Sequence, residues 1–166
     1  MMIQDTTLET ESVTLVPVEF NFSTRHFLKH LIRSYRYNTL RTGTEINQAL
    51  RLARYFWFIR DRHDPSFGGA IWLSYNPDSC TWSLDGMRDE TFVKTLPVKR
   101  PWAFDAVRIV TEWFFSEHPE VKIIYSGVNV KNRGMICVFK RLGFKYVCSL
   151  AMKNDLSYEL WGLSNE

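Results

Sequence analysis

Basic side chains that have no acids near them mark a segment of the chain where an anion could bind. The segment from Val128 to Val147, "VNVKNRGMICVFKRLGFKYV", holds five Lys and Arg residues and no acid. Its polar turn is followed by a predicted helix, for which Asn132 is the N-cap and Gly143 the stop. Arg133 lies at the start of that helix, where it could meet a phosphate group, and plain exposure to solvent is the alternative.

A second basic segment runs from Phe20 to Thr44 and also contains five basic residues and no acid. Arg25, Lys29 and Arg33 recur every four residues, so they share one face of a predicted helix. Such a stripe can contact an acidic protein or the phosphates of a nucleic acid. A solvated helix face is the alternative interpretation.

Other reactive side chains do not form a recognisable site in the sequence. His26 and His30 are four residues apart on the same predicted helix, a spacing that can hold a metal, but no third ligand accompanies them. Ser126, His63 and Asp85 do not match the motif of a nucleophilic triad. We therefore predict neither a metal site nor a serine nucleophile.

The composition is that of an ordinary globular protein. The chain has 166 residues and is 45% hydrophobic, which predicts a single domain over residues 1–166 with a substantial core. A formal net charge of +3 does not by itself indicate nucleic-acid binding. The three cysteines form no CxxC pair and the first residues lack the features of a secretory signal, which predicts reduced thiols in a cytoplasmic protein. No apolar run approaches membrane-spanning length, so no membrane contact is expected.

The periodicity of apolar residues predicts an α/β (α+β) chain with a mixed, mostly antiparallel sheet and helices on its faces. Predicted strands cover residues 13–18, 55–61, 70–75, 80–87 and 121–128, and two more form a hairpin after residue 143. Predicted helices cover residues 23–37, a segment from about 42, 101–117 and 132–142. The order is β-α-α-β-β-β-α-β-α-β-β. Residues 88–102 are predicted as a polar connection, and the apolar run 121–128 is typical of a strand covered on both faces.

The end of the chain carries a more specific pattern within this order. Asn132 begins the last long helix, Phe139 is an aromatic residue near its end, and Leu142-Gly143-Phe144 opens the next strand. With these residues in this element order, the chain resembles the GNAT superfamily of acetyl-CoA-dependent N-acetyltransferases. The resemblance covers nearly the whole chain as topology and is sequence-specific toward the C-terminus. It implies a single GNAT-like domain that transfers an acetyl group from acetyl-CoA to an amine.

The resemblance also implies where acetyl-CoA would lie. In such a fold two adjacent parallel strands splay apart, here by position 82–87 and 123–128, and the coenzyme occupies the gap. Its pyrophosphate sits at the start of the central helix, which here opens at Pro101. The corresponding stretch "VKRPWAFDA" contains no glycine, so Lys99 and Arg100 would have to bind the anion through their side chains. The residues expected at the coenzyme are Lys99, Arg100, Trp102, Ala103, Asn132, Arg133 and Phe139.

The chemistry implied by the resemblance is direct attack of an amine on the thioester. Asp85 is the best-placed carboxylate to act as general base, with a bound water as the alternative. Backbone N–H groups of the strand around Ser126 would polarise the thioester carbonyl. Phe139 stands near the point where many members carry a tyrosine that protonates the departing thiolate, and phenylalanine has no proton to donate.

The missing glycines and Phe139 keep a second hypothesis open. The chain could be a non-catalytic GNAT-fold scaffold whose basic helix, with Arg25, Lys29 and Arg33, binds an acidic protein or nucleic acid. Its overall look is similar to degenerate GNAT-like proteins of tailed bacteriophages, some of which are tied to virion assembly. A phage origin would place the protein in the host cytoplasm or in the virion.

Overall fold

The computed structural model describes residues 5–18, 22–34, 43–96, 101–151 and 157–166. The strands are β1 (Leu8–Glu9), β2 (Val13–Pro17), β3 (Ala53–Asp61), β4 (Phe67–Asn76), β5 (Thr81–Arg88), β6 (Ile123–Asn129), β7 (Lys145–Ala151) and β8 (Ser157–Ser164). The helices are α1 (Phe22–Ser34), α2 (Gly43–Leu52), α3 (Glu90–Thr95), α4 (Trp102–Glu117) and α5 (Arg133–Leu142). The predicted order is confirmed, with the short β1 and α3 added to it.

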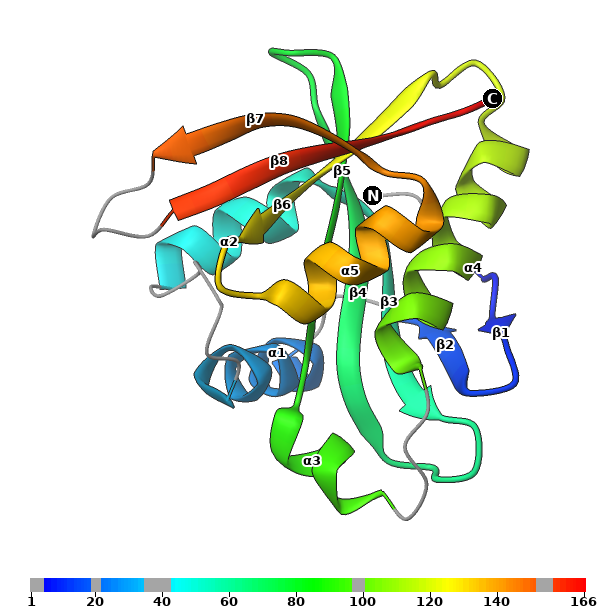
Figure 1. Cartoon of the computed structure of the whole chain (residues 1–166). Helices are drawn as coiled ribbons and strands as arrows, with labels where there is room; N and C mark the ends of the chain where they lie inside the picture. Colours follow the sequence, from blue (N-terminus) through cyan, green and yellow to red (C-terminus); the bar gives the residue numbers. More distant parts are fainter. Residues whose placement is uncertain (1–4, 19–21, 35–42, 97–100, 152–156) are drawn as a thin grey trace.

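All the described strands belong to one sheet, in the order β1-β2-β3-β4-β5-β6-β8-β7 (Figure 1). Neighbouring strands run antiparallel except β5 and β6, which run parallel. The predicted α+β class with a mixed, mostly antiparallel sheet is therefore confirmed. The parallel pair lies in the interior of the sheet, and the crossover between its strands passes through α3 and α4.

Two apolar clusters lie on opposite faces of the sheet because side chains alternate along each strand. One cluster joins α4 and α5 to the sheet and includes Val110, Phe114, Phe139 and Ile124. The other joins α1 and α2 to β3, β4 and β5, with Leu28 and Leu31 of α1 among its buried members. Among the described residues, no member of this second cluster comes from β6, β7 or β8.

Helix α5 begins and ends where its local sequence predicts. In α5 the side chain of Asn132 accepts the backbone N–H of Met135 at 3.2 Å, and Gly143 closes the helix with φ of 91°. That positive φ is a left-handed conformation that glycine adopts without steric cost. Both predicted caps of α5 are confirmed.

Two expectations about local structure were wrong. Residues 88–102 are not only a connection, because Asp89 accepts the N–H of Phe92 at 3.1 Å and starts the short helix α3. The strand β6 joins an apolar core cluster on one face only, that of Ile124 and Val128; on the alternate face Gly127 is exposed, Tyr125 is half-buried and the polar Asn129 is buried. An apolar run does not by itself show whether both faces join an apolar core, because Tyr125 and Gly127 extend the run without belonging to a core cluster.

The described residues show few other special features. All three cysteines carry free thiols. Within the parts of the chain that the structure describes, no helix is both long and apolar enough to cross a bilayer. The same parts bring together no group of three side chains that could hold a metal ion.

Candidate active site at the fork between β5 and β6

The parallel strands β5 and β6 are paired only where they begin. The register joins Trp82 to Ile124 and Ser83 to Tyr125, and no later residues of the two strands are paired. Figure 1 shows the strands side by side at their starts and running in different directions at their ends. We call the point of separation, just beyond Ser83 and Tyr125, the fork. Backbone N–H and C=O groups beyond it on β5 have lost their neighbour in β6, so they are available to an extended ligand.

A side chain of β6 marks the position of the fork. Ser126 is buried, and its hydroxyl donates a hydrogen bond of 2.7 Å to the backbone oxygen of Leu84. The bond bridges the strands one residue beyond their last paired residues, Ser83 and Tyr125. The hydroxyl of Ser126 therefore joins the two strands at the fork. The expected role of backbone N–H groups near Ser126 in polarising a thioester stays a prediction.

Asp85 is the carboxylate nearest to the fork on β5, two residues beyond Ser83. Its Cα partner on β4 is Trp72, so its side chain lies on the face covered by α1 and α2. Desolvation by the surrounding protein raises the pKa of Asp85 from 3.8 to about 6, although the residue keeps contact with solvent. No hydrogen bond or ion pair joins its side chain to another described residue, which leaves the carboxylate available to accept a proton.

The first turn of α4 supplies unbonded N–H groups close to α5. The first backbone bond of this helix runs from Asp105 to Pro101 at 2.9 Å, so the N–H groups of Trp102, Ala103 and Phe104 precede it. Pro101 makes no side-chain cap, and the guanidinium of Arg141 in α5 lies 4.5 Å from the ring centroid of Phe104. An anion could bind at these N–H groups.

Four residues at or just before the start of α4 were predicted to bind the coenzyme, and the structure describes two of them. The indole of Trp102 is buried and donates to Asp61 at 3.0 Å, so its backbone is the part that could meet a ligand. Ala103 is half-buried beside it. Lys99 and Arg100 lie outside the described residues.

The turn between β6 and α5 is shaped by two asparagines. Asn129 is buried, and its side-chain oxygen accepts the N–H of Lys131 at 2.9 Å, while Asn132 caps the helix that follows. Arg133 is exposed in the first turn. Asn129 was not among the predicted site residues. The signal that could have identified it is an asparagine directly after the predicted strand 121–128 and two residues before the basic Lys131.

Phe139 is a core residue. It is 2% exposed and stacks on Phe144 with ring centroids 4.6 Å apart. The ring therefore holds α5 against the sheet, and its position offers no proton to a leaving group. Its expected proximity to the coenzyme stays a prediction.

A hydrogen bond between an exposed histidine and a buried carboxylate lies just beyond the far end of β5. The Nε2 atom of His30 in α1 is 2.8 Å from the carboxylate of Asp89. Burial acts to raise the pKa of Asp89, but hydrogen bonds from His30 and from the N–H groups of Phe92 and Thr91 outweigh it and lower the pKa. The contact joins α1 to the residue that follows β5, four residues beyond Asp85. The same helix carries the predicted basic stripe, and its members Arg25, Lys29 and Arg33 are exposed.

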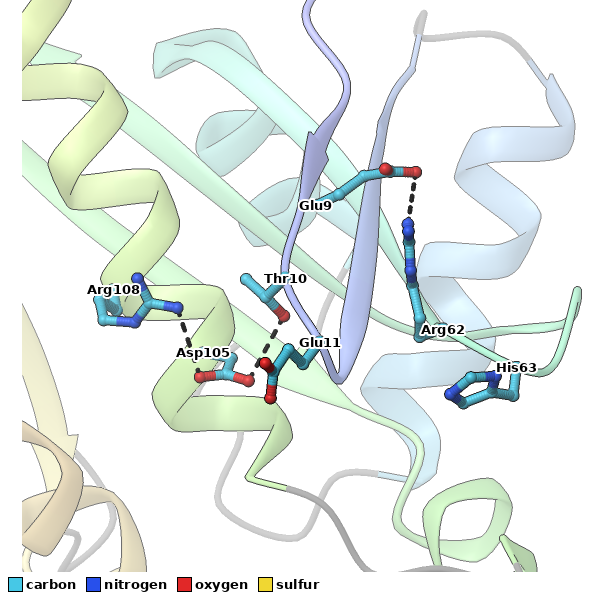
Figure 2. A pocket seen from close by; sticks show the side chains of 7 residues that line it. All are labelled: Glu9, Thr10, Glu11, Arg62, His63, Asp105 and Arg108. Atoms are coloured by element: carbon cyan, nitrogen blue, oxygen red, sulfur yellow. Dashed lines mark hydrogen bonds and ion pairs between the residues drawn. The ribbon is translucent and has the colours of Figure 1, made fainter.

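A pocket of about 740 Å³ lies elsewhere, between the β1–β2 turn, the β3–β4 turn and α4 (Figure 2). Its charged groups pair with one another: Arg62 with Glu9 at 2.7 Å, and Arg108 with Asp105 at 3.6 Å. Asp105 also accepts a hydrogen bond from Thr10 at 3.4 Å. These charged groups contact one another, so their presence in the pocket does not require a ligand. The fork remains the candidate active site.

No protein-family model matches the chain, and no curated protein matches it. Its structure is similar to that of an acetyltransferase of the GNAT family from Bacillus anthracis, with a TM-score of 0.68, 9% identity, and 96% of this chain and 98% of that chain covered. The ribosomal-protein-S5-alanine acetyltransferase from Vibrio fischeri gives a TM-score of 0.70, 14% identity and 98% coverage of both chains.

The fold is that of the GNAT acetyltransferases. A further structure of this fold, the ribosomal L7/L12 α-N-protein acetyltransferase in complex with coenzyme A, gives a TM-score of 0.65 with 11% identity, covering 93% of this chain and 95% of that chain. At these identities the likeness establishes the GNAT fold and leaves function to the site itself.

Proposed function

We propose that this GNAT-fold protein transfers the acetyl group of acetyl-CoA to a primary amine. The observation that carries the proposal is the fork, where β5 and β6 separate after two paired residues and a solvent-accessible carboxylate, Asp85, stands beside the opening. A strand edge opened in the middle of a sheet is unusual because its backbone groups need partners. The coenzyme complex recorded for a structure of the same fold supports acetyl-CoA as the donor.

The proposed coenzyme contacts use the groups around the fork. The pantetheine arm would pair with the open edge of β5. The N–H groups at the start of α4 would bind pyrophosphate, helped by Arg133 and by the side chains of Lys99 and Arg100. This arrangement does without the glycines that usually let phosphate approach bare backbone.

In the proposed reaction the amine nitrogen attacks the thioester carbonyl, the C–S bond breaks, and the thiolate leaves. Asp85, directly or through a water, takes the proton that the amine loses, and its raised pKa of about 6 suits a base at neutral pH. Backbone N–H groups at the fork, near Ser126, would stabilise the negative charge that develops on the carbonyl oxygen. Phe139 is buried, so the thiolate would take its proton from water.

Titration calorimetry with acetyl-CoA tests the proposal at its first step. We expect binding of acetyl-CoA and CoA, and a rise in the melting temperature by mass action. Acetyl transfer is then followed by release of free thiol with a panel of amines. Asp85→Asn should bind acetyl-CoA as the wild type does but transfer slowly. No heat of binding and no thermal shift at millimolar acetyl-CoA would overturn the proposed function.

A further inference from the structure

We infer that Asp61 and Trp102 are positioning residues for the coenzyme. They hold the first turn of α4 in place, so that its backbone N–H groups form a rigid site for the pyrophosphate of acetyl-CoA. This inference rests on the proposed function. Residues 98–106, which include this turn, contain no glycine, and a buried side chain anchors the turn instead.

The indole of Trp102 is the anchor of the turn. Trp102 is 3% exposed, and its Nε1–H donates to a carboxylate oxygen of Asp61 at 3.0 Å. The other oxygen of Asp61 accepts the backbone N–H of His63 at 2.9 Å, so both oxygens are used and the carboxylate is fixed at the end of β3. Because Trp102 is the first residue of α4, a bond to its side chain restrains the backbone where the helix begins.

The indole lies in a socket shaped by Gly68 of β4 and Phe92 of α3. The rings of Phe92 and Trp102 have centroids 6.1 Å apart. A Cβ added to Gly68 would lie 2.3 Å from the ring of Phe92 and 2.9 Å from the indole, closer than real Cβ atoms approach other atoms. Glycine at this position therefore lets both rings lie against the backbone of β4, and a side chain there would displace them.

The end of the same turn is also held by a side chain. Asp105 accepts hydrogen bonds from the hydroxyl groups of Ser12 and Thr10, which belong to the β1–β2 turn. Figure 2 shows the bond from Thr10. Residues three positions apart lie on the same side of a helix, so Trp102 and Asp105 attach one side of the turn to β3 and to the β1–β2 turn.

These contacts leave the backbone N–H groups of the turn unused. A serine, threonine or aspartate N-cap would hold a helix start by accepting its N–H groups. Pro101 makes no such bond, and the first backbone bond of α4 runs from Asp105 to Pro101. Within the described part of the chain, the N–H groups of Trp102, Ala103 and Phe104 therefore have no acceptor. A helix start fixed through side chains and open at its backbone suits an anion.

A fixed turn should bind pyrophosphate more tightly than a loose one. Each residue that a ligand must order on binding costs conformational entropy, and this cost reduces the affinity. The backbone donors must also lie at hydrogen-bond distance from the phosphate oxygens, which a displaced turn would not provide. Loss of the anchor should therefore weaken the contact with pyrophosphate and leave the contact of the pantetheine arm with β5 unchanged.

The test compares two ligands that share the acetyl-pantetheine arm. Acetyl-CoA carries the pyrophosphate, whereas acetyl-pantetheine lacks it together with the adenosine. Calorimetry gives the Kd of acetyl-CoA, and displacement of acetyl-CoA gives the Kd of acetyl-pantetheine. The variants are Trp102→Phe, which removes the indole N–H, Asp61→Ala, which removes its acceptor, and Gly68→Ala, which displaces the rings.

Trp57→Phe is the matched control. Trp57 is fully buried in the apolar cluster that also contains Trp102, and its indole N–H donates to the backbone oxygen of Thr6 at 2.9 Å. The substitution therefore removes a similar hydrogen bond. Trp57 contacts α4 through the ring of Trp113, with centroids 5.3 Å apart, so the control perturbs this helix away from its first turn.

We expect each of the three variants to raise the Kd of acetyl-CoA about tenfold, because hydrogen bonds to a charged group are lost or distorted. The Kd of acetyl-pantetheine should stay within about twofold of the wild type. Trp57→Phe should lower the melting temperature by an amount similar to Trp102→Phe and change neither Kd by more than about twofold.

The outcomes separate this inference from the proposed function. An unchanged Kd of acetyl-CoA in Trp102→Phe, or equal rises in the Kd of both ligands, overturns the inference, while binding of acetyl-CoA by the wild type keeps the proposed function. The same ligand-selective loss in Trp57→Phe also overturns it. If Asp61→Ala does not fold, Trp102→Phe and Gly68→Ala decide the result. A wild-type protein that does not bind acetyl-CoA overturns both the proposed function and the inference.

Discussion

Ser126 donates a hydrogen bond of 2.7 Å to the backbone oxygen of Leu84, at the point where two parallel strands separate. The bond closes the sheet just before the strands diverge, and both residues are buried. It thus holds β5 and β6 together at one end of the opening. The proposed pairing of the pantetheine arm with the open edge of β5 requires an opening of fixed width, because a ligand paired with a strand edge tolerates little displacement.

Removing this hydroxyl should loosen the fork. Ser126→Ala leaves the buried oxygen of Leu84 without its partner, which we expect to lower the free energy of unfolding by about 1–3 kcal/mol. Urea denaturation measures the loss, and calorimetry should show weaker binding of acetyl-CoA. Ser116→Ala, on the exposed side of α4, is the control and should change stability by less than about 0.5 kcal/mol. Equal behaviour of the two variants would show that the hydrogen bond does not hold the fork.

Asp85→Asn should separate catalysis from binding. We expect kcat to fall about 10²–10⁴-fold, since the amide cannot accept the proton of the amine. Affinity for acetyl-CoA should be unchanged, because the side chain lies on the face of α1 and α2. Measuring kcat and the Kd of acetyl-CoA in the same variant distinguishes a loss of catalysis from a loss of binding. An unchanged kcat would exclude Asp85 as the base.

The raised pKa of Asp85 gives two pH effects of opposite direction. The rate should rise with pH through about 6, where the base loses its proton, as a plot of kcat/KM against pH would show. Stability should fall as the pH rises from about 3.8 to about 6, because the unfolded chain releases this proton near 3.8 and the folded chain near 6. Asp85→Asn should remove the fall and stabilise the protein at pH 7 by about 1 kcal/mol, a value reduced by the residue's contact with solvent. Below pH 3.8 the two proteins should be equally stable.

Asp89 should stabilise the end of β5 through its lowered pKa. Asp89→Ala removes the contact with His30 and the cap of α3, which we expect to cost about 1–2 kcal/mol at pH 7. Because the pKa is lowered in the folded state, this contribution is present above the ordinary carboxyl range and is lost as pH falls through the folded pKa. Thermal unfolding at pH 7 and at pH 3 should therefore show a smaller difference between the proteins at pH 3. A pH-independent difference would assign the effect to packing.

The two caps of α5 should contribute to the free energy of unfolding independently of each other. Asn132→Ala should lower the free energy of unfolding by about 1 kcal/mol, because the N–H of Met135 loses its acceptor. Gly143→Ala should lower it by a similar amount, since alanine is strained at φ of 91°. Urea denaturation of the single and double variants should give additive losses, as expected of distant sites. If both variants match the wild type in stability, the caps do not hold this helix.

Local sequence was sufficient for the parts of the fold that local energetics control. The unit from β6 through α5 to β7 was predicted from an asparagine cap, an apolar period and a glycine stop, and the structure has each of them. The helix α3 was missed because it is only six residues long and is capped by Asp89. The side chain of Asp89 is in turn held by a contact with His30 of α1. No periodicity can indicate a helix of that length.

The candidate site was predictable in its outline and not in its detail. Asp85 was identified by its position on a strand, but its raised pKa comes from protein packed around it in three dimensions. Phe139 was predicted to lie at the coenzyme, which stays a prediction; what the structure adds is that its ring packs on Phe144 in the core. Whether an aromatic residue on a helix faces a ligand or a neighbouring strand depends on contacts that the helical period does not specify.

The sequence by itself determined the class of the fold, the order of its elements and the caps of α5, because these depend on residues within a few positions of one another. The tertiary structure decided where β5 and β6 part, which face Asp85 occupies, and that only one face of β6 joins an apolar core cluster. Those features depend on partners such as Ser126 and Leu84, which are 42 residues apart in the chain. Contacts at that separation form only when the whole sheet assembles, so no local pattern records them.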